Sequence, residues 1–204
     1  MFCKSSSQEK FVIETSFGEI TFILYEETPF HKENFIKLIE SSFFDGCLFH
    51  RIIPGFMIQG GDPSSKKAGP KEKLGSGGPG YTIPAEFNEN LFHKKGALAA
   101  ARKPDGVNSK KASNGSQFYI VEGRKWTKEE LINISTKQGL SFSEEQLKFY
   151  TNIGGYPPLD QNYTVFGEVI SGLDVISKIS NLERDRNNRP IKDVKIKIKP
   201  YSGK

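Results

Sequence analysis

Apolar and polar residues alternate near the start of the chain in the pattern of a β-hairpin. Residues 11–25, FVIETSFGEITFILY, hold two alternating runs on either side of SFGE, a sequence typical of a tight turn. The next segment, residues 28–46, has the spacing of an amphipathic helix, with Thr28 before Pro29 at its start and Gly46 just beyond its end. Its predicted buried face carries Phe35, Leu38 and Ile39.

Later segments return to strand-like patterns. Residues 48–60 alternate again around the turn-forming IPG, and residues 193–201 alternate lysine with isoleucine, which predicts a strand with one solvated face. Three apolar runs predict further strands, and a fourth run predicts a short amphipathic helix. These four runs are, in order, residues 96–102, 116–122, 164–170 and 172–181.

Two loops and one insertion interrupt these elements. Residues 62–80 and 103–115 are rich in glycine, proline, lysine and serine, which predicts loops. Residues 124–156 instead carry charge pairs at helical spacing, and Ser143 stands three residues before Gln146, as in a capping box. We therefore predict a helical insertion at about 124–156.

Composition favours one β-rich or mixed domain. The chain has 204 residues, with 16 phenylalanines to fill a core and 20 glycines and 11 prolines to form turns. We predict an N-terminal tail at residues 1–10 and a single domain at 11–204. The net charge of +5 comes from lysines dispersed along the chain, so no nucleic-acid binding is predicted. No apolar run reaches the roughly 18 residues of a membrane-spanning helix.

Some residues and motifs could suggest a metal or cofactor site, but their spacing and flanking sequence do not fit one. Cys3 and Cys47 form no C-x-x-C pair and the three histidines share no ligand spacing, so no disulfide framework or metal site is predicted. Residues 75–80, GSGGPG, fit the dinucleotide pattern but follow no strand, and Pro84 prevents a helix after them. No cofactor is predicted. The isolated carboxylates, which argue against a glycosidase, are Glu86, Asp105 and Asp160.

The N-terminal sequence MFCKSSSQEK leaves two compartments open. It is polar and lacks the apolar segment of a signal peptide, which predicts a cytoplasmic protein. Cys3 followed by serines is the alternative pattern. It would be the lipidated residue of an envelope or periplasmic lipoprotein whose signal peptide had been removed.

The stretch LFHRIIPGFMIQGGDP, residues 48–63, places an arginine among large apolar residues without a nucleophile. Taken alone, Arg51 fits an edge-strand residue whose stem packs on aromatics while its head is solvated. Three later blocks, GSGGPG, NGSQFYI and LDQNYTVFGEV, follow it in the order and approximate spacing of the cyclophilin family of peptidyl-prolyl cis-trans isomerases. The chain resembles this family over residues 11–200, apart from the insertion.

The resemblance implies a closed eight-stranded antiparallel β-barrel capped by two helices, with the active groove on its outer wall. It implies a monomer that rotates X-Pro bonds in proline-containing peptides and unfolded protein chains, and so assists folding. Arg51 is then the catalytic arginine, and Gln59 and Gln117 orient the peptide. The other implied substrate-binding residues are Phe56, Met57, Tyr119 and Leu159 in the proline pocket, Gly75, Ala101 and Arg102 at its rim, and Tyr163.

An alternative of a different class is a proline-binding chaperone or interaction module with little turnover. A binding module needs the pocket but not the charge of Arg51, so the arginine favours the enzyme.

Some positions differ from the best-known members of the family. Pro158 stands where many eukaryotic cyclophilins have tryptophan, and it has no N–H to donate to cyclosporin. We therefore expect weak cyclosporin binding, at least about tenfold below that of those members. Tyr163, in place of histidine, and the insertion are similar to bacterial cyclophilins. Arg102 replaces a small polar residue at the rim, which would favour acidic residues before the proline.

Overall fold

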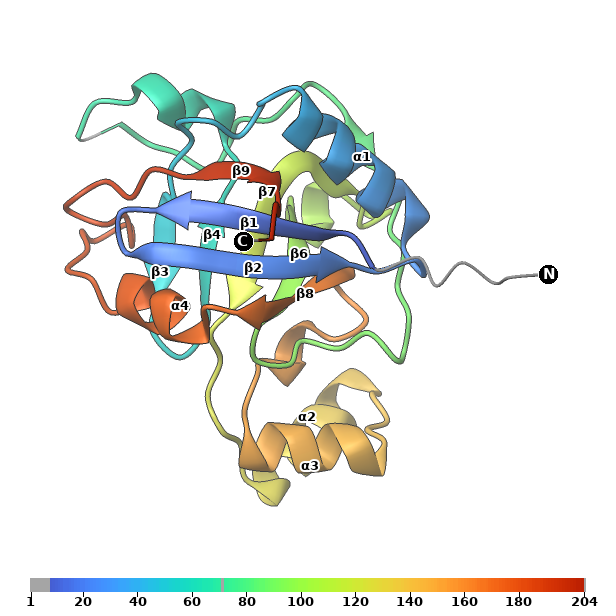
Figure 1. Cartoon of the computed structure of the whole chain (residues 1–204). Helices are drawn as coiled ribbons and strands as arrows, with labels where there is room; N and C mark the ends of the chain where they lie inside the picture. Colours follow the sequence, from blue (N-terminus) through green and yellow to red (C-terminus); the bar gives the residue numbers. More distant parts are fainter. Residues whose placement is uncertain (1–7, 71, 204) are drawn as a thin grey trace.

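The computed structural model describes residues 8–70 and 72–203, which fold mainly into antiparallel strands (Figure 1). The predicted hairpin is confirmed, because the first two strands pair with Thr15 opposite Gly18. The predicted strand at 48–60 is divided by its turn into two. The strands are β1 (Lys10–Thr15), β2 (Gly18–Leu24), β3 (Arg51–Ile53), β4 (Met57–Gly60), β5 (Thr82–Ile83), β6 (Ala97–Arg102), β7 (Ser113–Val121), β8 (Val165–Ser171) and β9 (Lys197–Pro200).

The prediction of a closed barrel is wrong, because the sheet is an open half-barrel. Its order is β3-β4-β7-β6-β8-β2-β1-β9, with β5 pairing with β7 off this path, and within the described ranges no ladder joins β3 to β9. The reason lies at the short edge strand β3, where Ile52 donates its N–H to Asn188 O, in a loop, at 2.8 Å. Isolated backbone bonds bridge the gap nearby, as from Phe49 N to Val194 O at 2.9 Å.

Two helices pack against the sheet and two more form the insertion, as predicted (Figure 1). The first helix ends before the expected boundary near Gly46, because the chain turns at Ser42, whose φ is 54°. The α-helices are α1 (Pro29–Glu40), α2 (Lys128–Gln138), α3 (Glu144–Asn152) and α4 (Leu173–Ser180), and the 3-10 turns are η1 (Pro63–Lys67), η2 (Asp105–Val107) and η3 (Pro157–Leu159).

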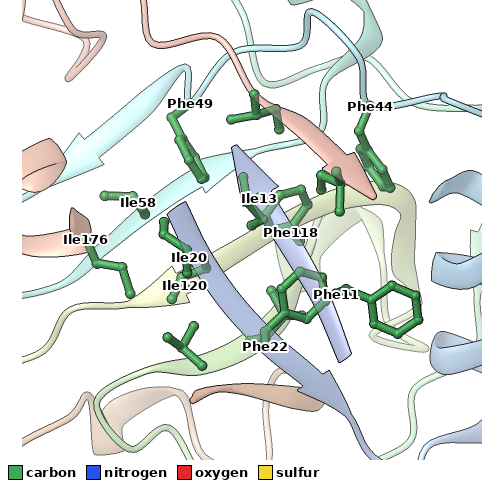
Figure 2. Packing of buried hydrophobic residues seen from close by; sticks show 14 of the residues in the cluster. Phe11, Ile13, Ile20, Phe22, Phe44, Phe49, Ile58, Phe118, Ile120 and Ile176 are labelled. Atoms are coloured by element: carbon green, nitrogen blue, oxygen red, sulfur yellow. The ribbon is translucent and has the colours of Figure 1, made fainter. Parts of the chain in front are cut away.

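The main core lies inside the curved sheet, where inward-facing side chains from β1, β2, β4 and β7 meet (Figure 2). Phe35 of α1 closes the core, with its ring 5.4 Å from that of Phe118 and 6.0 Å from that of Phe22. Burial of these apolar residues is the main stabilising term. It also means that outward-facing residues of the same strands are free to form a site.

The insertion has a small core of its own beside the sheet. Both of its helices begin with complete capping boxes, formed by Thr127 with Glu130 and by the predicted pair Ser143 and Gln146. Its fully buried members are Leu131 and Tyr150, which pack with Phe92 from the main domain. Apolar contacts with Phe92 therefore help to hold the insertion against the rest of the fold.

The N-terminal predictions fall largely outside the described residues. β1 begins at Lys10, close to the predicted end of the tail. Cys3, the proposed lipid anchor, is not among the described residues. No helix in the described part of the chain is long and apolar enough to cross a membrane.

Candidate active site

A cavity of about 440 Å³ opens on the outer face of the sheet, beside β3, β4, β6 and β7. It brings together every predicted site residue except Gln117. Those lining it are Arg51, Phe56, Met57, Gln59, Gly75, Ala101, Arg102, Tyr119, Leu159 and Tyr163.

Strand alternation explains the arginine within an apolar run. In the β3–β4 pair Arg51 lies opposite Gln59, and Ile52 lies opposite Ile58. Both isoleucines are fully buried in the core, so Arg51 and Gln59, which are next to them on the two strands, face outward into the cavity. The register of β4 with β7 then places Tyr119 opposite Gln59.

A chain of amide hydrogen bonds orients the head of Arg51. Its Nη1 donates to Gln59 Oε1 at 3.2 Å, and Gln59 Nε2 donates to Gln117 Oε1 at 3.0 Å. Gln117 Nε2 in turn donates to Gly77 O at 2.7 Å. Gln117 is therefore buried behind Gln59, where it fixes the amide orientation without lining the cavity.

The guanidinium of Arg51 is half-buried and forms no ion pair with a carboxylate among the described residues, although Glu72 and Asp185 line the same cavity. Its Cζ lies 5.8 Å from the centroid of the Phe56 ring. Burial lowers the pKa of Arg51 from its ordinary value, but a guanidinium remains charged at physiological pH. The site thus presents a positive charge with free N–H donors beside an apolar surface.

Aromatic contacts hold the apolar walls in place. The Phe56 ring stacks on Tyr156 with centroids 4.1 Å apart and an interplanar angle of 29°. The Tyr119 and Tyr163 rings meet edge to face at 6.0 Å. Burial raises the pKa of Tyr119 well above its usual value, so its hydroxyl keeps its proton. These walls are suited to a compact apolar ring such as that of proline.

At the rim of the cavity, the guanidinium of Arg102 is held by contacts within the chain. Arg102 lies next to a register shift between β6 and β7. Its Cζ lies 4.4 Å from the centroid of the Tyr163 ring, and its Nε donates to Asn162 O at 2.7 Å. Its Nη1 binds Asp105 at 2.5 Å. This ion pair offsets the charge that would favour acidic residues before the proline.

The glycine-rich residues 75–80 wrap around a carboxylate of their own chain. Asp62 accepts hydrogen bonds from Gly75 N at 2.7 Å, Gly77 N at 3.2 Å and Ser64 N at 2.8 Å. Burial acts to raise the pKa of Asp62, but these backbone donors together lower it below the usual value. A Cβ at Gly77 would lie 2.1 Å from Asp62 Oδ1, so close approach requires glycine there.

Sequence reasoning missed several residues of the cavity. His50 could have been found from the sequence, because it precedes Arg51 in the same block. The residues from 185–189 could not, because they reach the cavity through a loop that lies beside the edge of β3. The missed residues are His50, Glu72, Lys73, Leu74, Ser76, Asp185, Asn187 and Arg189. Across residues 8–70 and 72–203, no cluster of three histidine, cysteine or carboxylate side chains could hold a metal ion.

Comparisons with known proteins show the family of the chain. The family model described as cyclophilin type peptidyl-prolyl cis-trans isomerase/CLD matches residues 10–199. A Staphylococcus saprophyticus protein, provisionally named a peptidyl-prolyl cis-trans isomerase, is 32% identical over 193 residues, covering 94% of this chain and 91% of that protein.

Solved structures give the same result. A Cryptosporidium parvum cyclophilin type peptidyl-prolyl cis-trans isomerase matches with a TM-score of 0.72 at 25% identity, over 97% of this chain and all (100%) of that one. The same protein crystallised in the presence of the dipeptide Ala-Pro matches with a TM-score of 0.69 at 26% identity, over 95% and 99% of the two chains.

Proposed function

The chain belongs to the cyclophilin-type peptidyl-prolyl cis-trans isomerases, and on that premise we propose that Arg51 stabilises the twisted state of an X-Pro bond held in the cavity. The observation that carries this proposal is a guanidinium with no ion-pair partner among the described residues, facing the apolar wall formed by Phe56, Met57 and Leu159. The substrates are proline-containing peptides and unfolded chains. The Ala-Pro dipeptide present with the Cryptosporidium relative supports this substrate class.

The chemistry of the reaction explains why no acid, base or nucleophile is needed. Rotation about the bond meets a barrier of about 18–20 kcal/mol and takes roughly 10–100 s unaided. In the twisted state amide conjugation is lost, and the proline nitrogen gains a lone pair that can accept a hydrogen bond. A donor that binds this nitrogen more strongly as the bond twists lowers the barrier.

The surroundings of Arg51 make such a donor effective. Gln59 holds one N–H of the guanidinium in place, so little reorientation is needed when the bond twists. Phe56, Met57 and Leu159 form an apolar wall, and an apolar setting strengthens a charge-assisted hydrogen bond. Because all of these groups come from one chain, we propose that a monomer is active. The weak binding of cyclosporin stays a prediction.

Exchange NMR on an Ala-Ala-Pro-Phe peptide tests the role of Arg51. We expect the wild type to accelerate cis-trans exchange and Arg51→Ala to lower kcat/KM by about 10²–10³, the loss typical of one preorganised donor. The matched control is Arg184→Ala, which removes an exposed arginine outside the cavity and should leave kcat/KM unchanged.

The same experiment separates the enzyme from a proline-binding module. If the wild type binds the peptide without accelerating exchange, the cavity is a recognition site. If Arg51→Ala keeps full activity, another group stabilises the twisted bond and the proposed mechanism is wrong.

A further inference from the structure

A buried line of hydrogen bonds connects the insertion to the cavity. The Tyr150 hydroxyl, on α3, donates to Asp160 Oδ2 at 2.6 Å. Asp160 Oδ1 accepts from the backbone N and from Nδ1 of His93, each at 2.8 Å. His93 Nε2 lies 2.9 Å from the Tyr119 hydroxyl, and Tyr119 is a wall of the cavity.

The partners determine which way each proton points. A neutral imidazole carries its hydrogen on one nitrogen and accepts on the other. The tautomer that donates from Nδ1 to Asp160 leaves a lone pair on Nε2, which accepts from the Tyr119 hydroxyl. This bond directs the hydroxyl toward His93 and leaves the tyrosine ring to face the cavity.

Every member of the line is shielded from water. His93 and Tyr150 are fully buried, and Asp160 and Tyr119 are each 4% exposed. A buried carboxylate needs all of its donors, because an unmade hydrogen bond there is costly. The insertion supplies the donor for Oδ2, so the orientation of Asp160, and through it that of His93, depends on α3.

Apolar contacts also connect the insertion with the walls of the cavity. Phe92, next to His93, packs edge to face on the rings of Phe149 at 5.7 Å and Tyr150 at 5.5 Å. On the other side, the Trp126 ring meets Tyr156 at 5.9 Å, and Tyr156 stacks on Phe56 of the cavity. The insertion therefore contacts the supports of two separate pocket walls.

We infer that Tyr150 is a positioning residue, which orients Tyr119 in the proline pocket through Asp160 and His93. This inference rests on the proposed proline pocket. It gives the insertion a role in the isomerase reaction. Without the anchor, the Tyr119 hydroxyl is free to leave His93, and the tyrosine ring loses its fixed orientation in the wall of the cavity.

The test is a double-mutant cycle measured as kcat and KM by exchange NMR on the Ala-Ala-Pro-Phe peptide. Tyr150→Phe removes the hydroxyl but keeps the ring between Phe92 and Phe142. We expect kcat/KM to fall by about tenfold, mostly through KM, within the losses that misplaced site groups cause. The matched control, Tyr81→Phe, removes a 2.6 Å hydrogen bond to Asn34 outside the cavity and should leave kcat and KM unchanged.

The second arm combines Tyr150→Phe with Tyr119→Phe. The Tyr119→Phe variant has no hydroxyl at this position to misplace, so we expect the Tyr150 substitution to change kcat/KM by less than about twofold in that background. Equal losses in both backgrounds would show a general effect on folding and overturn the inference. An unchanged kcat/KM in Tyr150→Phe alone would also overturn it.

Arg51→Ala, measured in parallel, keeps the two proposals apart. If Arg51→Ala loses activity and Tyr150→Phe does not, only the positioning role fails. If the wild type itself does not accelerate exchange, it is the proposed function that fails.

Discussion

At the scale of single residues, hydrogen bonds from neighbouring side chains fix the orientation of the polar groups of the site. Gln117 holds Gln59, and Gln59 holds Arg51. His50 is the exception. It lines the cavity and is 4% exposed, yet neither ring nitrogen has a hydrogen-bond partner in the described part of the chain. No hydrogen bond therefore orients the His50 ring, and we expect its burial to affect the free energy of unfolding instead.

We predict that His50 makes the protein less stable in mild acid. Burial lowers the pKa of His50 to about 4. Between pH 6.5 and 4 the unfolded chain binds a proton that the folded chain does not, so stability falls as the pH falls through this window. From pH 7 to pH 5 the free energy of unfolding should drop by about 2 kcal/mol from this group alone.

Urea unfolding at pH 7 and pH 5 checks this prediction. The pKa of His31 is also lowered, by burial, so the comparison of interest is between wild type and His50→Gln. The variant should lose less stability than the wild type over this interval. Equal losses in the two proteins would mean that His50 titrates normally in the folded state.

The sequence could identify individual residues of the site but not the partners of its carboxylates. Arg51 and Gln59 were recognisable because they lie in one short block with a strand pattern. Asp160 was interpreted as isolated, because its partner His93 is 67 positions away in the chain. Contacts at such separation leave no local pattern, so only the folded structure reveals them.

At the scale of elements, local patterns predicted the helices and strands. The contacts that hold these elements to residues far away in the sequence were not predictable. α1 illustrates this. Its N-cap residue Thr28 makes no side-chain capping bond. Instead, Glu86 accepts from Phe30 N at 3.1 Å and from His31 N at 2.9 Å, and it also binds His31 Nδ1. A carboxylate from a distant loop therefore caps this helix.

We predict that Glu86→Gln destabilises the protein by about 1–3 kcal/mol, because a charged acceptor at a helix N-terminus is lost. Urea unfolding at pH 7 measures the change. Glu89→Gln, in the same loop but with an exposed side chain, is the control and should shift the free energy by less than about 0.5 kcal/mol. An effect of equal size in both variants would argue against a capping role.

Whether the sheet closes into a barrel or stays open could not be predicted from the sequence either. Strand patterns indicate that a segment is extended and which face is buried, but not which edges pair. Residues 51–53 form too short a strand for a full ladder, and the loop containing Asn188 occupies the edge of β3 instead. The open edge matters for function, because Asp185, Asn187 and Arg189 of this loop line the cavity.

At the scale of the whole molecule, the described residues form three apolar clusters of unequal size, one of which, around Met57, Tyr119 and Val165, lies beneath the cavity. The largest fills the curved sheet (Figure 2). The smallest joins α2 and α3 to Phe92. The insertion was predicted from its charge pairs and capping box. Its attachment to the sheet could not be predicted, because it depends on contacts such as Gln146 Nε2 to Glu89 O at 2.8 Å.

The unequal cores predict that the insertion opens before the sheet does. Local stability follows the apolar area that each unit buries, and the insertion buries only a few large side chains. In hydrogen exchange at pH 7, amides of α2 and α3 should exchange faster than those of β6, β7 and β8, which lie within the sheet. Tyr150→Phe should raise exchange in α2 and α3 and leave β6 to β8 unchanged. Exchange of both regions at one common rate would instead mean that the insertion and the sheet unfold as a single cooperative unit.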